Sequence, residues 1–103
     1  MPGRYIRDGY LTSERVDALS LDAERFYFRL LLVVDDFGRY LANAAILRSM
    51  CFPLKGDIST GQIAAWMNEC AKAGLIVVYS VDGKKYLAID RFGQRPRSRK
   101  SRY

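Results

Sequence analysis

The chain has 103 residues, 50% of them hydrophobic and 13% aromatic, which is enough for one hydrophobic core but too few residues for two. This composition excludes wholesale disorder, and no unbroken apolar run approaches the roughly twenty residues of a membrane-spanning helix. The formal net charge of +6 suggests an acidic partner, so the position of the charges matters.

The positive charges are concentrated at the carboxyl end. Residues 1–90 contain eleven Lys and Arg and all eleven acids, so that segment is neutral, whereas residues 91–103 contain six basic residues and no acid. We expect one folded domain over 1–90 and a basic, flexible tail over 91–103. A solubility segment, a localisation signal or a linker to a further domain are alternative interpretations of this tail.

Histidine is absent, and Cys51 and Cys70 do not have the spacing of a metal-ligand motif. Without a phosphate-binding glycine loop or convergent carboxylates, the sequence predicts no enzyme, no cofactor and no metal site. The first residues lack the charged and apolar segments of a secretory signal, which indicates a reducing compartment. Both cysteines are therefore expected to be buried thiols.

Two helices are predicted in the first third of the sequence. A short capped helix over 12–19 would bury Val16 and Leu19. A longer helix would run from its N-cap, Ser20, to Asp36, with negative charge in its first turn.

The longer helix is apolar on nearly all sides, apart from a stripe formed by Asp22, Arg25 and Arg29. This pattern is typical of a central helix wrapped by the rest of a domain. Asp35 and Asp36 at its end allow a catalytic-dyad interpretation, but adjacent helical residues do not converge on one point. A solvated helix end is expected instead.

Gly38 is expected to end this helix in a left-handed conformation, with a short strand following over 39–41. Asn43 then caps a third helix, which Pro53 stops before a turn at 55–57. The apolar face of the third helix consists of Ala44, Ile46, Leu47, Met50 and Cys51.

The fourth predicted helix covers residues 60–73, because Ser59 and Gln62 have the spacing of a capping box and Gly74 provides a stop. Its inward side consists of Ile63, Met67 and Cys70, flanked by Trp66 and Ala71. Its outward side is small and polar, and consists of Gly61, Ala65, Asn68 and Lys72, with Gln62 and Glu69 at the edge.

Asp82-Gly83 lies between two segments of strand character, 75–81 and 84–89, and predicts a two-residue β-hairpin. A loop of this length fixes the register and places the lysines at the tip. The predicted pairs are Val81 with Lys84, Ser80 with Lys85, Tyr79 with Tyr86, Val78 with Leu87, and Val77 with Ala88.

These elements predict a mainly α fold with a small β-hairpin, a winged helix-turn-helix, whose fourth helix enters the major groove of double-stranded DNA. Gln62 and Asn68 would offer amides to adenine edges, and Lys72 would reach a phosphate. Ser59 and Thr60 at the helix N-terminus would hold another phosphate. The remaining candidate DNA-binding residues are Lys84 and Lys85 at the hairpin tip and Arg91, Arg95, Arg97, Arg99, Lys100 and Arg102 in the tail.

Each of these features also has a plainer interpretation. Lysines are ordinary solubilising residues at a hairpin tip, and the outward face of the fourth helix can be a solvated surface, where Glu69 disfavours close approach to phosphate. Trp66 and Met67 are expected in the core rather than as a base-stacking platform. DNA binding is favoured because it is the interpretation in which the polar face of the fourth helix, the hairpin tip and the basic tail all act on one side of the molecule.

The hairpin sequence Asp82-Gly83-Lys84-Lys85-Tyr86-Leu87, preceded by Ala73-Gly74-Leu75-Ile76, is the most specific part of a wider pattern. The pattern also includes Tyr5-Ile6, Leu19-Ser20, Asp36-Phe37-Gly38-Arg39 and Phe52-Pro53. Over about residues 4–95 it resembles the amino-terminal winged-helix domain of phage replisome-organiser and DnaD-like replication proteins. Related patterns occur in other winged-helix proteins, including repressors.

The resemblance implies origin-DNA binding in replication initiation, self-association as a homodimer, and contact with replication proteins. It also implies a location at the nucleoid in the cytoplasm of a bacterial host, with no membrane contact. A repressor-like transcriptional regulator, a protein-interaction domain, and RNA binding led by the tail stay open as alternatives. Tyr5 and Tyr10 are candidate residues for a self-association surface.

Overall fold

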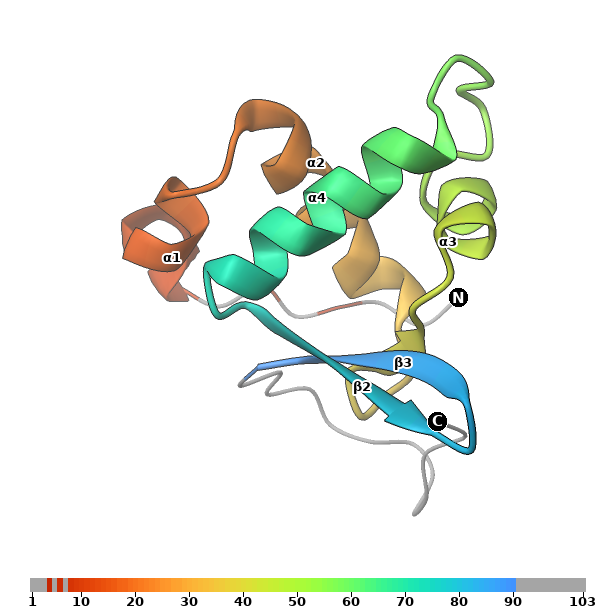
Figure 1. Cartoon of the computed structure of the whole chain (residues 1–103). Helices are drawn as coiled ribbons and strands as arrows, with labels where there is room; N and C mark the ends of the chain where they lie inside the picture. Colours follow the sequence, from red (N-terminus) through yellow and green to blue (C-terminus); the bar gives the residue numbers. More distant parts are fainter. Residues whose placement is uncertain (1–3, 5, 7, 91–103) are drawn as a thin grey trace.

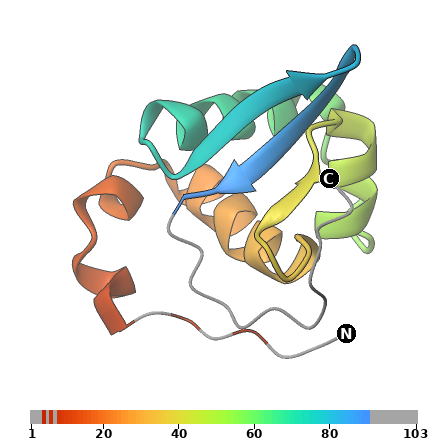
Figure 2. The same cartoon turned by 90° about the horizontal axis from the view of Figure 1, so that it is seen from below.

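Helices and a small sheet form two layers. The computed structural model of the chain describes residues 4, 6 and 8–90. In Figure 1 α4 crosses in front of α2 with the sheet below the helices, and Figure 2 shows the sheet from below. The elements are η1 (Asp8–Thr12), α1 (Glu14–Asp17), α2 (Leu21–Val33), β1 (Arg39–Leu41), α3 (Ala44–Cys51), α4 (Thr60–Lys72), β2 (Ile76–Val81) and β3 (Lys84–Ile89).

The predicted hairpin is formed by β2 and β3, and all five predicted residue pairs are observed, beginning with Val81 opposite Lys84. Asp82 and Gly83 have φ angles of 50° and 80°. A type I′ turn requires positive φ at both central residues, which explains why this dipeptide sets the register.

The hairpin is part of a larger sheet than the sequence predicted. The strand expected over 39–41 is present as β1, and it pairs antiparallel with β3, with Tyr40 opposite Leu87. The strand order is therefore β1-β3-β2, and the described residues form a mixed fold of four α-helices and a three-stranded antiparallel sheet. A strand of three residues gives no sequence signal for its partner, so this pairing was not predicted.

Polar side chains begin the helices as expected. Ser20, Asn43 and Ser59 each accept a hydrogen bond from the backbone N–H three residues further on, at the starts of α2, α3 and α4. Gly74 has a φ of 78° and follows the end of α4, as predicted. The short helix predicted over 12–19 is reduced to α1, with η1 before it.

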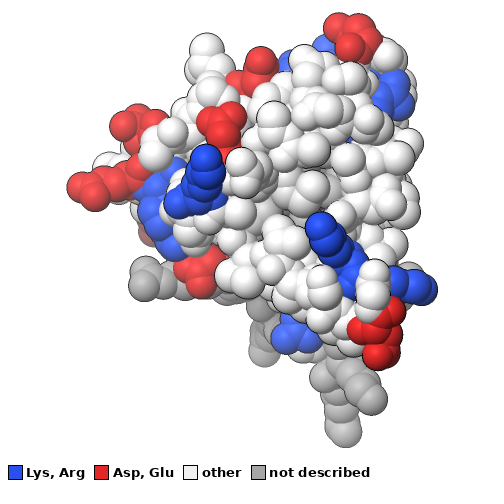
Figure 3. Space-filling model, viewed as in Figure 1, with Lys and Arg blue, Asp and Glu red and all other residues white. Residues whose placement is uncertain are grey.

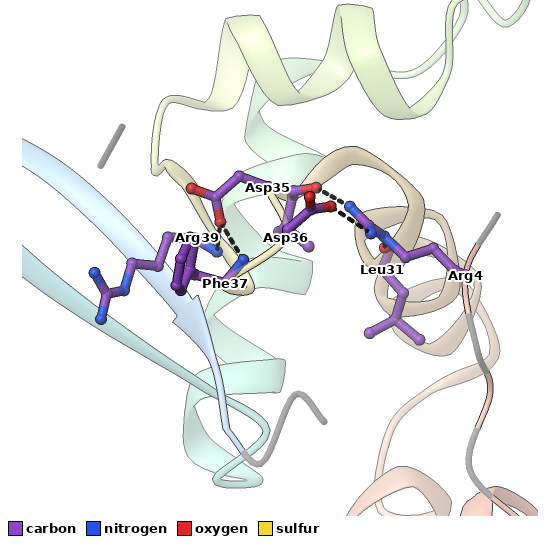
Figure 4. Close-up of polar contacts among 7 residues, drawn as sticks. Arg4, Leu31, Asp35, Asp36, Phe37 and Arg39 are labelled. Carbon is purple, nitrogen blue, oxygen red and sulfur yellow. Dashed lines mark hydrogen bonds and ion pairs between the residues drawn. The ribbon is translucent and has the colours of Figure 1, made fainter. Parts of the chain in front are cut away.

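The end of α2 differs from the prediction. The helix stops at Val33, because Val34 is extended with φ −62° and ψ 160°. The Asp35 carboxylate accepts hydrogen bonds from the backbone N–H groups of Phe37 and Arg39, both at 2.9 Å, and holds a turn that leads into β1 (Figure 4). Gly38, with a φ of 78°, belongs to this turn rather than to the helix end.

Arg4 closes the end of α2 from the amino-terminal side. Its guanidinium donates to the backbone oxygens of Leu31 (2.9 Å) and Val34, and to the Asp36 carboxylate at 3.1 Å (Figure 4). The side chains of Arg4 and Asp36 are only 6% and 15% exposed. The expectation of a solvated helix end at Asp35 and Asp36 is therefore wrong, and the physical reason is that an arginine from outside the helix pairs with its last carbonyls.

The core lies between α2, α4 and the inner face of the sheet. Its largest fully buried side chains are Phe26, Phe52, Leu30, Leu47, Ile63, Ile76, Leu87 and Cys70. Cys51 and Cys70 are free and buried, as predicted, and burial raises the pKa of each thiol to about 12. No helix among the described residues is long and apolar enough to cross a membrane.

Two predicted apolar faces are less buried than expected. On α3, Ile46 and Met50 are exposed, because only one side of this short helix meets the core. On α2, Leu21, Phe28 and Leu32 are exposed, so the helix is not wrapped on all sides.

Candidate nucleic-acid interface

The outward face of α4 is open along its whole length. Gly61, Ala65, Asn68 and Lys72 are all exposed, as the helical wheel predicted. On the opposite side Trp66 is buried, with its ring centroid 5.8 Å from that of Phe52. This confirms that the tryptophan belongs to the core. The small outward side chains leave the helix backbone accessible to a bulky partner such as a DNA groove.

The capping box at the start of α4 engages two of the predicted DNA-binding residues. Ser59 Oγ accepts from the Gln62 backbone N–H at 3.1 Å, and Gln62 Oε1 accepts from the Ser59 backbone N–H at 2.9 Å. Gln62 Oε1 also accepts from Ser59 Oγ at 3.3 Å, so both of its lone pairs are used, and a bidentate contact between the Gln62 amide and an adenine would break a bond of the cap. Thr60 is exposed at the first turn.

Asn68 is differently placed from Gln62. Its side chain is exposed at the middle of the outward face, and within the described part of the chain no hydrogen bond to it is present. Its amide keeps both an acceptor and donors for a base edge. Of the two amides that the sequence analysis selected, Asn68 is the one that can make a bidentate contact without disturbing the helix.

Two arginines hold the turn between α3 and α4, and sequence reasoning missed this function. Arg29 donates to the backbone oxygen of Cys51 at 2.8 Å, at the end of α3. Arg48 donates to the backbone oxygens of Gly56 (3.1 Å) and Ile58. The Arg48 bonds fix the turn before α4 relative to α3, and the Arg29 bond joins the end of α3 to α2. Arginine in a helix has no motif that announces a backbone contact across a turn, so the sequence carried no usable signal.

Glu69 does not lie against the outward face as an isolated acid. Its carboxylate accepts from the Ser20 backbone N–H at 3.0 Å and from Ser20 Oγ at 2.9 Å. It therefore joins α4 to the N-terminus of α2, where a negative charge is favourable. The objection that Glu69 would repel phosphate is weakened because its oxygens are engaged on the α2 side.

The two lysines at the hairpin tip are exposed but lie on opposite faces of the sheet. Side chains alternate along a strand, so Lys85 shares its face with Leu87 and Ile89, which are buried under the helices. Lys84 lies on the other face, with Tyr86. Only Lys85 is on the side of the sheet that α4 covers.

The face that contains α4 and the hairpin is mainly uncharged. Figure 3 shows this view with an uncharged expanse over α4, separate basic groups toward the C-terminal end of α4 and beside the hairpin, and acidic groups at the periphery. No continuous basic patch covers this face of the described residues. The six basic tail residues from Arg91 to Arg102 lie outside the described residues, so their position beside α4 stays a prediction.

Within the described ranges, no three His, Cys, Asp or Glu side chains gather as a metal site could require. Comparisons with protein-family models, curated proteins and solved structures found no match to this chain. The resemblance to replication proteins therefore stays a prediction from the residues quoted for it.

Proposed function

We propose that residues 1–90 form a winged helix-turn-helix domain that binds double-stranded DNA, with α4 in the major groove. The observation that carries this proposal is the element order α2-β1-α3-α4-β2-β3 with sheet order β1-β3-β2. This order gives a helix pair joined by a turn, followed directly by a hairpin that extends from the second helix. Such a helix places its exposed side chains in the groove.

In this proposal the parts of the surface have different tasks. Asn68 contacts base edges, and the small residues Gly61 and Ala65 permit close approach of the helix. Lys72 and Lys85 contact phosphates on either side of the groove, and the tail supplies further phosphate contacts. Because the body is neutral, most of the salt-dependent affinity comes from the tail and most of the sequence preference from α4.

A test measures duplex binding of the full chain by fluorescence anisotropy at several salt concentrations. Changing Lys72, Lys84 and Lys85 to Ala should weaken binding and flatten the salt slope by up to about 1.8, from about 0.9 for each of the two phosphate contacts assigned to Lys72 and Lys85. Arg39→Ala serves as the control, because this exposed side chain is on β1, on the sheet face away from the helices. Unchanged binding by the triple variant, with its fold intact, would refute the assignment of this surface.

The process served by DNA binding is proposed to be replication initiation in a phage or mobile element, as the resemblance implies, with transcription control as the alternative. Selection of bound duplexes from a random pool at two salt concentrations would show whether a defined sequence is preferred. Equal binding of single-stranded RNA by the tail peptide and by the whole chain would favour the RNA alternative instead.

A second candidate function is protein recognition through α4. The specific observation in its favour is that the outward face of α4 is mainly uncharged (Figure 3), which suits a protein partner as well as a DNA groove. In that case Ala65→Glu would abolish partner binding while duplex binding through the tail persisted. If α4 contacts DNA, the same substitution lowers duplex binding, because it places a negative charge against the groove.

A further inference from the structure

The outer edge of β2 is an open edge of the sheet. The strand order β1-β3-β2 places this strand at one end, and in Figure 2 it is the outermost strand, on the side of the sheet where α4 lies. Among the described residues no strand pairs with its outer edge. Val77, Val78 and Val81 are 56%, 41% and 49% exposed, so the strand is also accessible to solvent.

The hairpin register determines which backbone groups of β2 face outward. With a two-residue loop, the pair that closes the turn exchanges both backbone hydrogen bonds, and every second pair along the strands does the same. The Asp90 N–H donates to the Leu75 oxygen at 2.9 Å, which fits this alternation. The residues whose N–H and C=O groups point away from β3 are therefore Ile76, Val78 and Ser80.

Two of these three residues are accessible to a partner. Ile76 is buried, whereas Val78 and Ser80 are exposed. In the part of the chain that the structure describes, no hydrogen bond to the outward groups of Val78 and Ser80 is present. Their two N–H and two C=O groups can therefore bond to another extended chain.

β2 lacks the features that usually block such an edge. Its residues Ile76–Val81 include no charge and no proline, and their pairing with β3 is continuous, without a bulge. Soluble proteins commonly protect a free edge with one of these devices, because an open edge pairs with other chains. An unprotected edge rich in valine is suited to the addition of a partner strand.

Lysines flank this uncharged edge at both ends. Lys84 and Lys85 follow β2 at the hairpin tip, and Lys72 is the last residue of α4, just before the strand. Figure 3 shows separate basic groups at the C-terminal end of α4 and beside the hairpin. Within the described ranges none of the three lysines has an ion-pair partner. The edge is therefore complementary to a segment that carries negative charge at its ends.

We propose that the β2 edge binds an extended acidic segment of a partner protein as an additional strand. The backbone groups of Val78 and Ser80 bond to the segment, and its acidic side chains meet Lys72 at one end and the hairpin lysines at the other. This inference does not rest on the proposed function. If both hold, the segment competes with DNA, because Lys72 and Lys85 are the proposed phosphate contacts.

Charge disfavours the occupants that this chain itself supplies. Segment 91–103 has six basic residues and no acid, so the lysines would repel it. A second β2 would bring the hairpin lysines of one copy beside Lys72 of the other when antiparallel, and beside each other when parallel. Tyr5, a candidate for self-association, lies outside the described residues, and the Tyr10 ring packs against Phe28 on α2.

A direct test measures binding of a fluorescent peptide to the full chain, without DNA. A peptide of about nine residues is long enough to span the edge, with alternating valine and threonine in the middle and two acidic residues at each end. Fluorescence anisotropy should show binding at chain concentrations below about 1 mM. The same peptide with lysines in place of its acidic residues should bind at least about tenfold more weakly, because like charges then meet.

Ser80→Pro tests the backbone contacts. Proline removes the outward N–H of this residue but no hydrogen bond of the hairpin, and should weaken binding of the acidic peptide about fivefold or more. The matched control is Ser80→Ala, which loses the same side chain, keeps the N–H and should bind as the unchanged chain does. Circular dichroism should show that both variants fold, and their duplex binding should be equal, because Ser80 makes no proposed DNA contact.

Amide hydrogen exchange of the unchanged chain supplies a second measurement. Saturating acidic peptide should slow exchange at Val78 and Ser80, because their N–H groups become bonded, whereas Tyr79, which already pairs with Tyr86 in the hairpin, is the internal reference. No binding below about 1 mM, equal binding of the two peptides, or unchanged exchange at Val78 and Ser80 would overturn the proposal. Protection of these amides that grows with the concentration of the chain alone would place a second copy on the edge and would also overturn it. Because no DNA is present, such a failure is distinct from a failure of the proposed function.

Discussion

Replacing Arg4 with Ala should destabilise the domain more than any exposed substitution. The Arg4 side chain is 6% exposed and holds together three acceptors at the end of α2: two backbone oxygens and the Asp36 carboxylate. Its loss leaves a carboxylate that is 15% exposed without this cation, and removes a positive charge from the negative end of a helix.

The magnitude follows from what is left behind. Breaking a buried ion pair by removing one partner costs about 3–5 kcal/mol. Because Arg4 lies near the amino terminus, water can reach the Asp36 carboxylate once the arginine side chain is gone. We therefore expect a loss of about 3 kcal/mol in the free energy of unfolding, at the lower end of this range. Arg4→Lys keeps the charge but not the planar fork that reaches several acceptors, and should lose about half as much.

Urea unfolding followed by circular dichroism measures this loss. The control is Arg39→Ala, which removes an exposed arginine and should change stability by less than about 0.5 kcal/mol. The double variant with Asp36→Ala should lose clearly less than the sum of the two single losses, because the unpaired carboxylate is then absent. A loss below about 1 kcal/mol for Arg4→Ala, or strict additivity, would refute this account of the α2 terminus.

Three further predictions concern the hairpin and the thiols. Lys85→Ala should flatten the salt slope of duplex binding by about 0.9, whereas Lys84→Ala should change this slope little, since Lys84 is on the outer sheet face. Anisotropy titrations of the two variants at several salt concentrations measure the slopes. Equal slopes would contradict the assignment of a phosphate contact to Lys85 and not to Lys84. Gly83→Ala should cost about 1 kcal/mol in urea unfolding, because its φ of 80° strains any side chain, and an unchanged midpoint would contradict this. Burial raises the thiol pKa of Cys51 and Cys70 from 9.0 to about 12, so the stability that the two thiols contribute should be complete below about pH 9 and should decline as pH rises toward 12. The free energy of unfolding should therefore be lower at about pH 10.5 than at pH 8. This difference should be smaller in the variant in which both cysteines are changed to Ala, and an equal difference would contradict the prediction.

Local signals predicted the parts of this fold that local chemistry determines. The caps Ser20, Asn43 and Ser59 and the turn Asp82-Gly83 act within four residues of themselves, and the structure confirms each of them. The hairpin register followed because a two-residue loop permits only one pairing. Such features need no knowledge of the rest of the chain.

Features that depend on distant residues were missed or wrong. The end of α2 was placed three residues too late, since Arg4, 27 residues away from Leu31, binds its last carbonyls. The pairing of β1 with β3 and the engagement of Glu69 with Ser20 are equally long-range. In the candidate interface the exposed side of α4 was predicted, whereas the arginines that hold the α3–α4 turn were not.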